Sequence, residues 1–164
     1  MKNHPKIEVP ATKMEKILHL LSLLLIIGSF IYVSVSFSSL PDEVPVHFNI
    51  NGEPDSWGNK ATILIMPIIS VFIFLPMYFL SKAPHTFNYM VKVTEENAPR
   101  IYPIARLMMA VINFFAMVLF AYIAWDMVQA AHGINYSGIW LFIITLGLPL
   151  LIIIFFGLWM NKVK

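Results

Sequence analysis

The side chains that could do chemistry in this sequence gather between Leu40 and Lys60. His47 lies there among four carboxylates, and imidazole together with carboxylates can hold zinc or another divalent ion. The carboxylates belong to Asp42, Glu43, Glu53 and Asp55. His47 has no second histidine at metal-ligand spacing, so a metal site at His47 and Asp55 stays an open candidate. Asp126 and His132 could complete that site only if the fold brought them near.

Other catalytic patterns do not stand out. The sequence has no cysteine, so neither a disulfide nor a thiolate nucleophile can form. We find no Ser/His/Asp order, no phosphate-cradling glycine loop and no pair of catalytic carboxylates. We therefore expect a protein without enzymatic activity and without a cofactor. A metal-dependent envelope enzyme that uses His47 and the nearby acids is kept as an alternative.

The stretch that carries these groups is predicted to form a short β-hairpin. Val44, Val46, Phe48 and Ile50 alternate with Pro45, His47 and Asn49, which is the pattern of a half-buried strand. Asn51-Gly52 then predicts a type I′ turn, because both central positions of that turn need positive φ. Trp57 suits the aromatic belt at a membrane surface. The candidate ligand-binding residues of this hairpin are Asp42, His47, Asn49, Gly52, Glu53, Asp55, Trp57 and Lys60.

The elements that must position this hairpin are membrane helices. Of the 164 residues 59% are hydrophobic and only 12% are charged, whereas soluble domains have about 25% charged residues. Four apolar stretches reach the roughly 20 residues that a membrane span needs, at about 17–37, 62–81, 104–125 and 138–160. The first exceeds the 7–15 apolar residues typical of a signal peptide, so we interpret it as a retained helix. The predicted fold is an all-α transmembrane four-helix bundle, a single domain over residues 1–164, with a short extracytoplasmic hairpin-like loop.

Orientation follows from the basic residues, which favour the cytoplasmic side of a membrane. Ten of the eleven Lys and Arg residues lie at the two termini or near the loop 82–103, and only Lys60 lies on the other side. We predict a multi-pass protein of the cytoplasmic membrane with both termini and loop 82–103 in the cytoplasm. Loops 38–61 and 126–137 then face outward. A net charge of +2 is too small to indicate nucleic acid as a partner.

Two polar residues fall inside the predicted third span. We expect Arg106 to extend its side chain to the cytoplasmic interface, and Asn113 to need a hydrogen bond to another helix. The predicted spans hold no carboxylate, which weighs against an acidic proton relay. Because the predicted spans contain three internal prolines and Asn113 lies deep, a small transporter or accessory membrane subunit is a second functional hypothesis.

The cytoplasmic loop offers a candidate docking surface. Thr94 followed by Glu95 and Glu96 is typical of a helix start with an N-cap and acidic residues in the first turn. The candidate docking residues are Asn88, Glu95, Glu96 and Asn97. The alternative is a plain connector that leads the chain into the third span.

Both loops resemble a known family. Leu40-Pro-Asp-Glu-Val-Pro-Val-His-Phe-Asn49, Gly52-Glu-Pro-Asp55 and Trp57-Gly-Asn-Lys60 resemble the signature of a bacterial membrane domain of unknown function. That domain also forms the N-terminal part of SdpI-type immunity proteins. Phe87-Asn88 and Val91-Lys-Val-Thr-Glu-Glu-Asn97 are similar to the stretch after its second helix, and the resemblance covers about residues 15–120.

The resemblance implies a function in the envelope of a bacterium with a Gram-positive-type membrane. SdpI-type proteins protect against a secreted toxic peptide and hold a transcriptional repressor at the membrane, and they carry further C-terminal helices that this four-span sequence lacks. Our leading hypothesis is therefore a non-enzymatic membrane protein with an immunity or envelope-sensing role through the outer loop. Its expected partners are the lipid bilayer and either a secreted peptide or another membrane protein.

Overall fold

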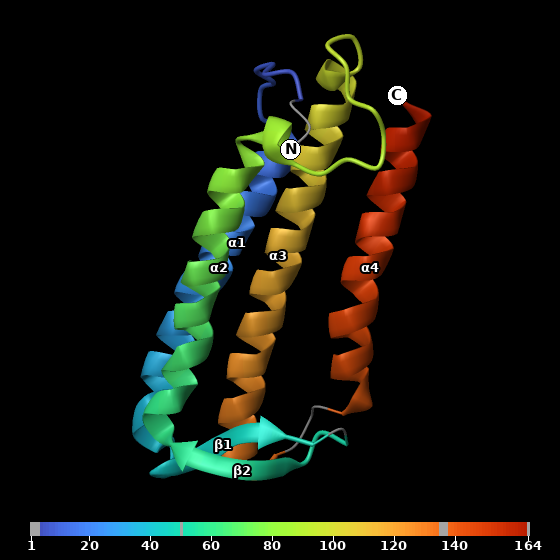
Figure 1. The fold of residues 1–164 in the computed structure, drawn as a ribbon. Coiled ribbons are helices and arrows are strands. Elements are labelled where there is room, and N and C mark those ends of the chain that lie inside the picture. Colours follow the sequence, from blue (N-terminus) through green and yellow to red (C-terminus); the bar gives the residue numbers. More distant parts are fainter. Residues whose placement is uncertain (1–3, 50, 135–137, 164) are drawn as a thin grey trace.

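Four long helices make up most of the computed structural model, which describes residues 4–49, 51–134 and 138–163 (Figure 1). They are α1 (Lys13–Ser36), α2 (Ile65–Ser81), α3 (Ala98–Ala131) and α4 (Ile139–Lys162). A 3₁₀ turn over Lys60–Leu64 precedes α2. With that turn counted, each of the four is long and apolar enough to cross a membrane. The predicted all-α transmembrane fold is thus confirmed.

Helix α3 is the centre of the arrangement, since it contacts each of the other three helices. Its 34 residues correspond to about 50 Å at 1.5 Å per residue, well beyond a hydrocarbon core of about 30 Å. It begins at Ala98 and ends at Ala131, so the third span was predicted about six residues too short at each end. Helix α4 lies beside α3 and leaves most of its apolar side chains exposed, as a lipid-facing helix does.

The bundle has two chemically different ends (Figure 1). The hairpin end carries the two β-strands. The terminal end carries residues 4–12, the connection 82–97 between α2 and α3, and the end of α4. Among the described basic residues, Lys60 lies at the hairpin end and the others lie toward the terminal end. Lys2 and Lys164 lie outside the described residues.

The hairpin consists of β1 (Glu43–Phe48) and β2 (Pro54–Asn59), paired antiparallel. This confirms the predicted hairpin. Its alternation, however, was predicted wrongly: Pro45 is fully buried and Val46 is 39% exposed. The ladder is irregular between Pro45 and His47, next to a residue that has no N–H to donate. Such a bulge shifts the side chains that follow to the other face. Ile50 lies outside the described residues.

The hairpin rests on the bundle through an apolar cluster. Val44 and Ile63 are fully buried there, together with Val33 of α1 and Ala124 of α3. A second cluster forms around Ile26, Phe74 and Met117 in the middle of the bundle. A third joins α3 to Phe156 and Met160 of α4 at the terminal end. Burial of β1 against α1 and α3 thus fixes the position of the hairpin relative to the spans.

Asn113 makes the interhelical bond that was predicted for it. Its side chain is fully buried, and Nδ2 donates to the carbonyl of Phe74 on α2 at 3.3 Å. In a membrane such bonds between helices are worth about 0.6 kcal/mol on average. This contact is the kind that holds two helices together.

Candidate functional site

The tip of the hairpin is organised by Asn49. Its side-chain Oδ1 accepts hydrogen bonds from the backbone N–H groups of Asn51 and Glu53, at 2.9 and 3.0 Å. Its carbonyl accepts from Gly52, which has φ 81°. Among the described residues no residue other than glycine has positive φ, so the type I′ turn was wrong. The Asn49 side chain satisfies the backbone in its place, as an Asx turn does.

Six of the eight hairpin candidates are brought together in three pairs. His47 Nδ1 and Asp55 Oδ1 lie 2.5 Å apart, Asn49 Nδ2 donates to Glu53 Oε2 at 3.1 Å, and Lys60 Nζ lies 3.1 Å from Asp42 Oδ1. Because the first pair is exposed, at 68% and 44% of the two side chains, it adds at most about 1 kcal/mol to stability. The pairs therefore restrain the positions of these side chains but contribute little to the stability of the fold.

Of the two remaining candidates, Trp57 is exposed and Gly52 is buried. Trp57 lies opposite Pro45 in the ladder and is 53% exposed. Gly52 is the turn residue with positive φ. The exposed side of the hairpin therefore presents an imidazole–carboxylate pair and a large aromatic ring. Val44 and Pro45 of β1 are buried. A surface of this kind can form hydrogen bonds and stacking contacts with a ligand.

Asp126 and His132 do not join this pair. Asp126 belongs to α3 and is 2% exposed, so its predicted place in an outer loop was wrong. His132 follows the end of α3 and its Nδ1 donates to the carbonyl of Val128 at 2.8 Å. In the described parts of the chain no group of three or more His, Cys, Asp or Glu residues is placed to hold a metal ion.

The candidate docking residues at the terminal end differ in availability. Asn88, Glu95 and Glu96 are exposed, whereas Asn97 is 8% exposed. Asn97 precedes α3: its Oδ1 accepts from the N–H of Thr94 at 2.8 Å, and its Nδ2 donates to the carbonyl of Lys92 at 3.0 Å. The helix therefore begins three residues later than the predicted N-cap at Thr94 implied. The side chain of Asn97 is used inside the loop rather than on its surface.

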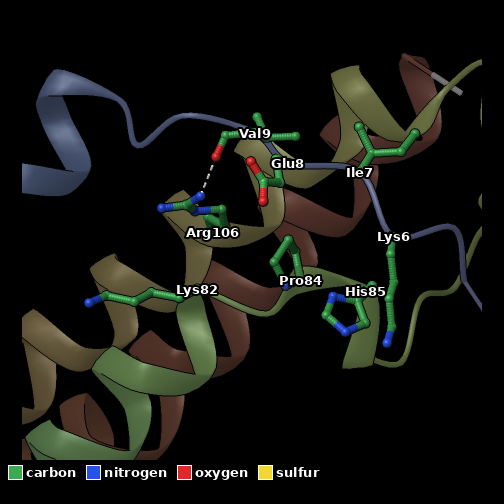
Figure 2. A pocket seen from close by; sticks show the side chains of 8 residues that line it. All are labelled: Lys6, Ile7, Glu8, Val9, Lys82, Pro84, His85 and Arg106. Atoms are coloured by element: carbon green, nitrogen blue, oxygen red, sulfur yellow. Dashed lines mark hydrogen bonds between the residues drawn. The ribbon is translucent and has the colours of Figure 1, made fainter.

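A buried ion pair that the sequence did not reveal joins Glu15 to Arg106. Glu15 Oε1 accepts from Arg106 Nε at 3.0 Å and from Nη2 at 2.7 Å, and the side chains are only 2% and 10% exposed. Arg106 Nη1 also donates to the carbonyl of Val9 (Figure 2). These acceptors hold the Arg106 side chain against the N-terminal segment and the first turn of α1. A span does contain a carboxylate, since α1 begins at Lys13.

Glu15 also caps α1. The Thr12 side chain accepts from the Glu15 N–H at 3.1 Å, and Glu15 Oε2 accepts from the Thr12 N–H at 3.4 Å. This is a capping box. Its sequence form, Thr12-Lys-Met-Glu15 before an apolar run, was the signal that could have placed the helix start and its carboxylate.

A pocket of about 480 Å³ lies beside this ion pair (Figure 2). Its polar lining comes from the N-terminal segment, from the end of α2, from the connection that follows and from α3. The groups are those of Lys6, Glu8, Lys82, His85 and Arg106. The neighbouring Tyr89 is held nearby, since its hydroxyl donates to the carbonyl of Pro84 at 2.8 Å. Burial raises the pKa of that hydroxyl well above its ordinary value, and Tyr102 adds to the effect.

Comparison with known proteins identifies the segment that contains the hairpin. Residues 24–71, from α1 through the hairpin into α2, match a family described as a domain of unknown function, DUF1648. The predicted resemblance to a membrane domain of unknown function is thereby confirmed. A protein of Archaeoglobus fulgidus, described as an uncharacterized protein, is 38% identical over 60 residues, which are 37% of this chain and 33% of the relative. The match thus spans about a third of that relative, and no solved structure matches. This chain is accordingly a membrane-type helical protein whose residues 24–71 match the DUF1648 domain.

Proposed function

We propose that this is a non-enzymatic membrane protein whose hairpin recognises a peptide or another envelope ligand, in an immunity or sensing role of the SdpI type. The observation that carries the proposal is that the hairpin buries apolar residues on the bundle and exposes polar and aromatic side chains. Val44 and Pro45 are buried against the bundle, while His47, Asp55 and Trp57 are exposed on the same short ladder. The exposed side chains of this platform are accessible to a ligand.

The chemistry of the platform suits recognition. Trp is among the residue types that contribute most to binding energy at interfaces, and 53% of Trp57 is exposed. The pairing of His47 with Asp55 and of Asn49 with Glu53 restrains side chains before a ligand arrives. Such preorganisation lowers the entropy cost of binding. The family match over residues 24–71 includes the whole hairpin, so the hairpin belongs to the segment that this chain shares with the family.

We further propose that the hairpin end faces outward from the cytoplasmic membrane and that both termini are cytoplasmic. The support is the distribution of basic residues, since Lys and Arg in short loops favour the cytoplasmic side. In this orientation a secreted peptide reaches the hairpin without crossing the bilayer. The terminal end, with Asn88, Glu95 and Glu96 exposed, is then available to a second membrane or cytoplasmic protein.

The test is protection from killing. The full chain is expressed in a strain that is sensitive to secreted membrane-active peptides, and its presence in the membrane is verified. Survival is compared for the wild type, for Trp57→Ala and for the pair His47→Ala with Asp55→Ala. The control is Lys92→Ala, an exposed change at the terminal end.

We expect protection by the wild type and by the Lys92 variant, and its loss in the hairpin variants at equal membrane levels. Protection that persists in both hairpin variants would show that the hairpin is not the recognition surface. A wild type that is present in the membrane but leaves killing by every tested peptide unchanged would overturn the immunity role.

A further inference from the structure

The pocket beside Arg106 has the charge of an anion site (Figure 2). Three of its lining side chains are cationic, those of Lys6, Lys82 and Arg106, and His85 adds an imidazole. Glu8 is the one carboxylate among the lining residues. Even when Glu15, the partner of Arg106, is counted with it, the permanent positive charges exceed the negative ones. The local potential therefore favours a negatively charged ligand.

Hydrogen-bond donors remain for such a ligand. Arg106 has five N–H groups, and its bonds to Glu15 and Val9 use three of them. His85 and Lys6 both line the pocket, and Figure 2 draws them on the side of the view away from Arg106. The amine of Lys82 is placed differently, 4.2 Å from the centre of the Tyr78 ring. Lys6 and His85 are thus the side chains best placed to approach an anion.

The pocket lies at the ends of membrane-length helices, where a bilayer surface is expected. It is bounded by the segment that precedes α1, which begins at Lys13, and by the residues that follow Ser81, the end of α2. Arg106 comes eight residues after the start of α3 at Ala98, or about 12 Å along the helix. Phosphate groups of lipids occupy this interfacial depth, and basic pockets between membrane helices on the cytoplasmic side bind anionic headgroups.

An apolar pocket lies next along the chain. Residues Thr86 to Tyr89 line a space of about 320 Å³ together with Leu80 of α2, Met108 of α3 and Met160 of α4. This space is suited to hydrocarbon rather than to water. A polar, positively charged pocket and an apolar one on adjacent residues of the same connection match the two parts of a lipid. This pairing favours a lipid over a free anion.

We propose that the pocket at the terminal end binds the phosphate headgroup of an anionic membrane lipid, with Lys6 and His85 as headgroup contacts and Arg106 at its inner wall. The proposal does not depend on what the hairpin recognises. It assigns to the N-terminal segment, which supplies Lys6, the role of closing a lipid site against α3.

The test measures lipid retention by the full chain. Protein purified in a neutral detergent is mixed with equal amounts of phosphatidylglycerol and phosphatidylcholine that carry the same acyl chains, and bound lipid is counted by native mass spectrometry. Lys6→Gln and His85→Gln are compared with Lys16→Gln, which removes an exposed charge at the same end but outside the pocket. Thermal unfolding of each variant checks the fold.

We expect the wild type and the Lys16 variant to retain phosphatidylglycerol in preference. Lys6→Gln should lower that retention about fivefold, the effect expected of one Lys or Arg near a membrane surface, and His85→Gln should lower it as well by removing a hydrogen-bond donor. An equal loss in the Lys16 variant would assign the preference to diffuse charge and overturn the site. Inorganic phosphate at large excess should leave the lipid bound; if it displaces the lipid and binds by itself, the ligand is a free anion and the lipid assignment is wrong.

Discussion

Glu15 and Arg106 are 91 residues apart in the sequence, yet one carboxylate oxygen of Glu15 accepts two hydrogen bonds from the guanidinium of Arg106. The same Glu15 side chain closes the capping box of α1 through its other oxygen. Glu15 therefore caps the N-terminus of α1 and also binds α1 to α3. Removal of either charge leaves the other buried without compensation.

The first prediction concerns this pair. Arg106→Leu and Glu15→Gln should each lower the free energy of unfolding by about 3–5 kcal/mol, the usual cost of breaking a buried ion pair from one side. Arg106→Lys should not restore the wild-type value, because a single ammonium cannot reproduce the fork that reaches both Glu15 and Val9. Denaturant titration of the purified protein in detergent measures the effect.

Arg100→Leu is the matched control, since Arg100 lies on the same helix but is exposed. It should change stability by less than about 0.5 kcal/mol. If Arg106→Leu were no more destabilising than Arg100→Leu, the pair would not be closed in the folded protein.

The second prediction tests the proposed orientation and uses the absence of cysteine from the sequence. A membrane-impermeant maleimide should label Ser56→Cys in intact cells, because Ser56 is exposed on β2. Glu95→Cys, exposed at the terminal end, should be labelled only after the cells are permeabilised. The unsubstituted chain gives the background, and the reverse pattern would place the hairpin in the cytoplasm.

The third prediction concerns Gly58, which lies opposite Val44 in the hairpin. A Cβ at this position would come within 2.9 Å of Val46 Cγ1, and the branched valine side chain has little rotamer freedom to move aside. Gly58→Ala should therefore destabilise the hairpin, by about 1–3 kcal/mol as in other overpacked sites.

Gly28→Ala is its counterpart, because nothing lies within 4 Å of a Cβ there and Ala favours a helix over Gly. It should leave stability unchanged or raise it. Protease digestion of the hairpin compares the two variants directly, and equal protection in both would contradict the close approach of Val46.

The fourth prediction concerns Tyr89 at alkaline pH. Burial raises the pKa of its hydroxyl in the folded protein, so the folded state holds its proton to higher pH than the unfolded state. Stability from this group is complete below the ordinary tyrosine pKa of about 10 and falls as the pH rises above it toward the folded pKa. Tyrosinate absorbance and unfolding curves measure this, and Tyr89→Phe should lessen the decline. A decline of the same steepness in that variant would assign it to other groups.

The apolar runs were sufficient to predict four helices, because a span must be apolar over its full length whatever its neighbours are. The hairpin could also be predicted, because a turn between two short strands depends on residues that are close in the sequence. Local sequence patterns could not predict which side chains from distant parts of the sequence pair with each other. The pairing of Arg106 was not predicted, because its acceptor, Glu15, lies on another helix and just outside the first predicted span.

The finer errors in the hairpin have a common cause. Asn51-Gly52 predicts a type I′ turn, but the side chain of Asn49 accepts from the backbone first and changes the turn. Val46 fits the alternation of a strand, but the ladder is irregular beside Pro45. At the turn the Asn49 side chain, and in the strand the missing N–H of Pro45, changes the local structure that the sequence pattern predicts. Whether the eight hairpin residues bind a ligand stays a prediction.

The double use of Glu15 has a consequence for the order in which the chain is assembled. A ribosome that delivers the first helix to the membrane has not yet made Arg106, so the carboxylate enters or waits at the bilayer surface without its partner. The helix reaches its final depth only when the third one arrives and the pair closes. We therefore expect the chain to be most susceptible to membrane proteases after α1 is inserted and before α3 is made. In that interval α1 is capped, but its Glu15 has not yet paired with Arg106.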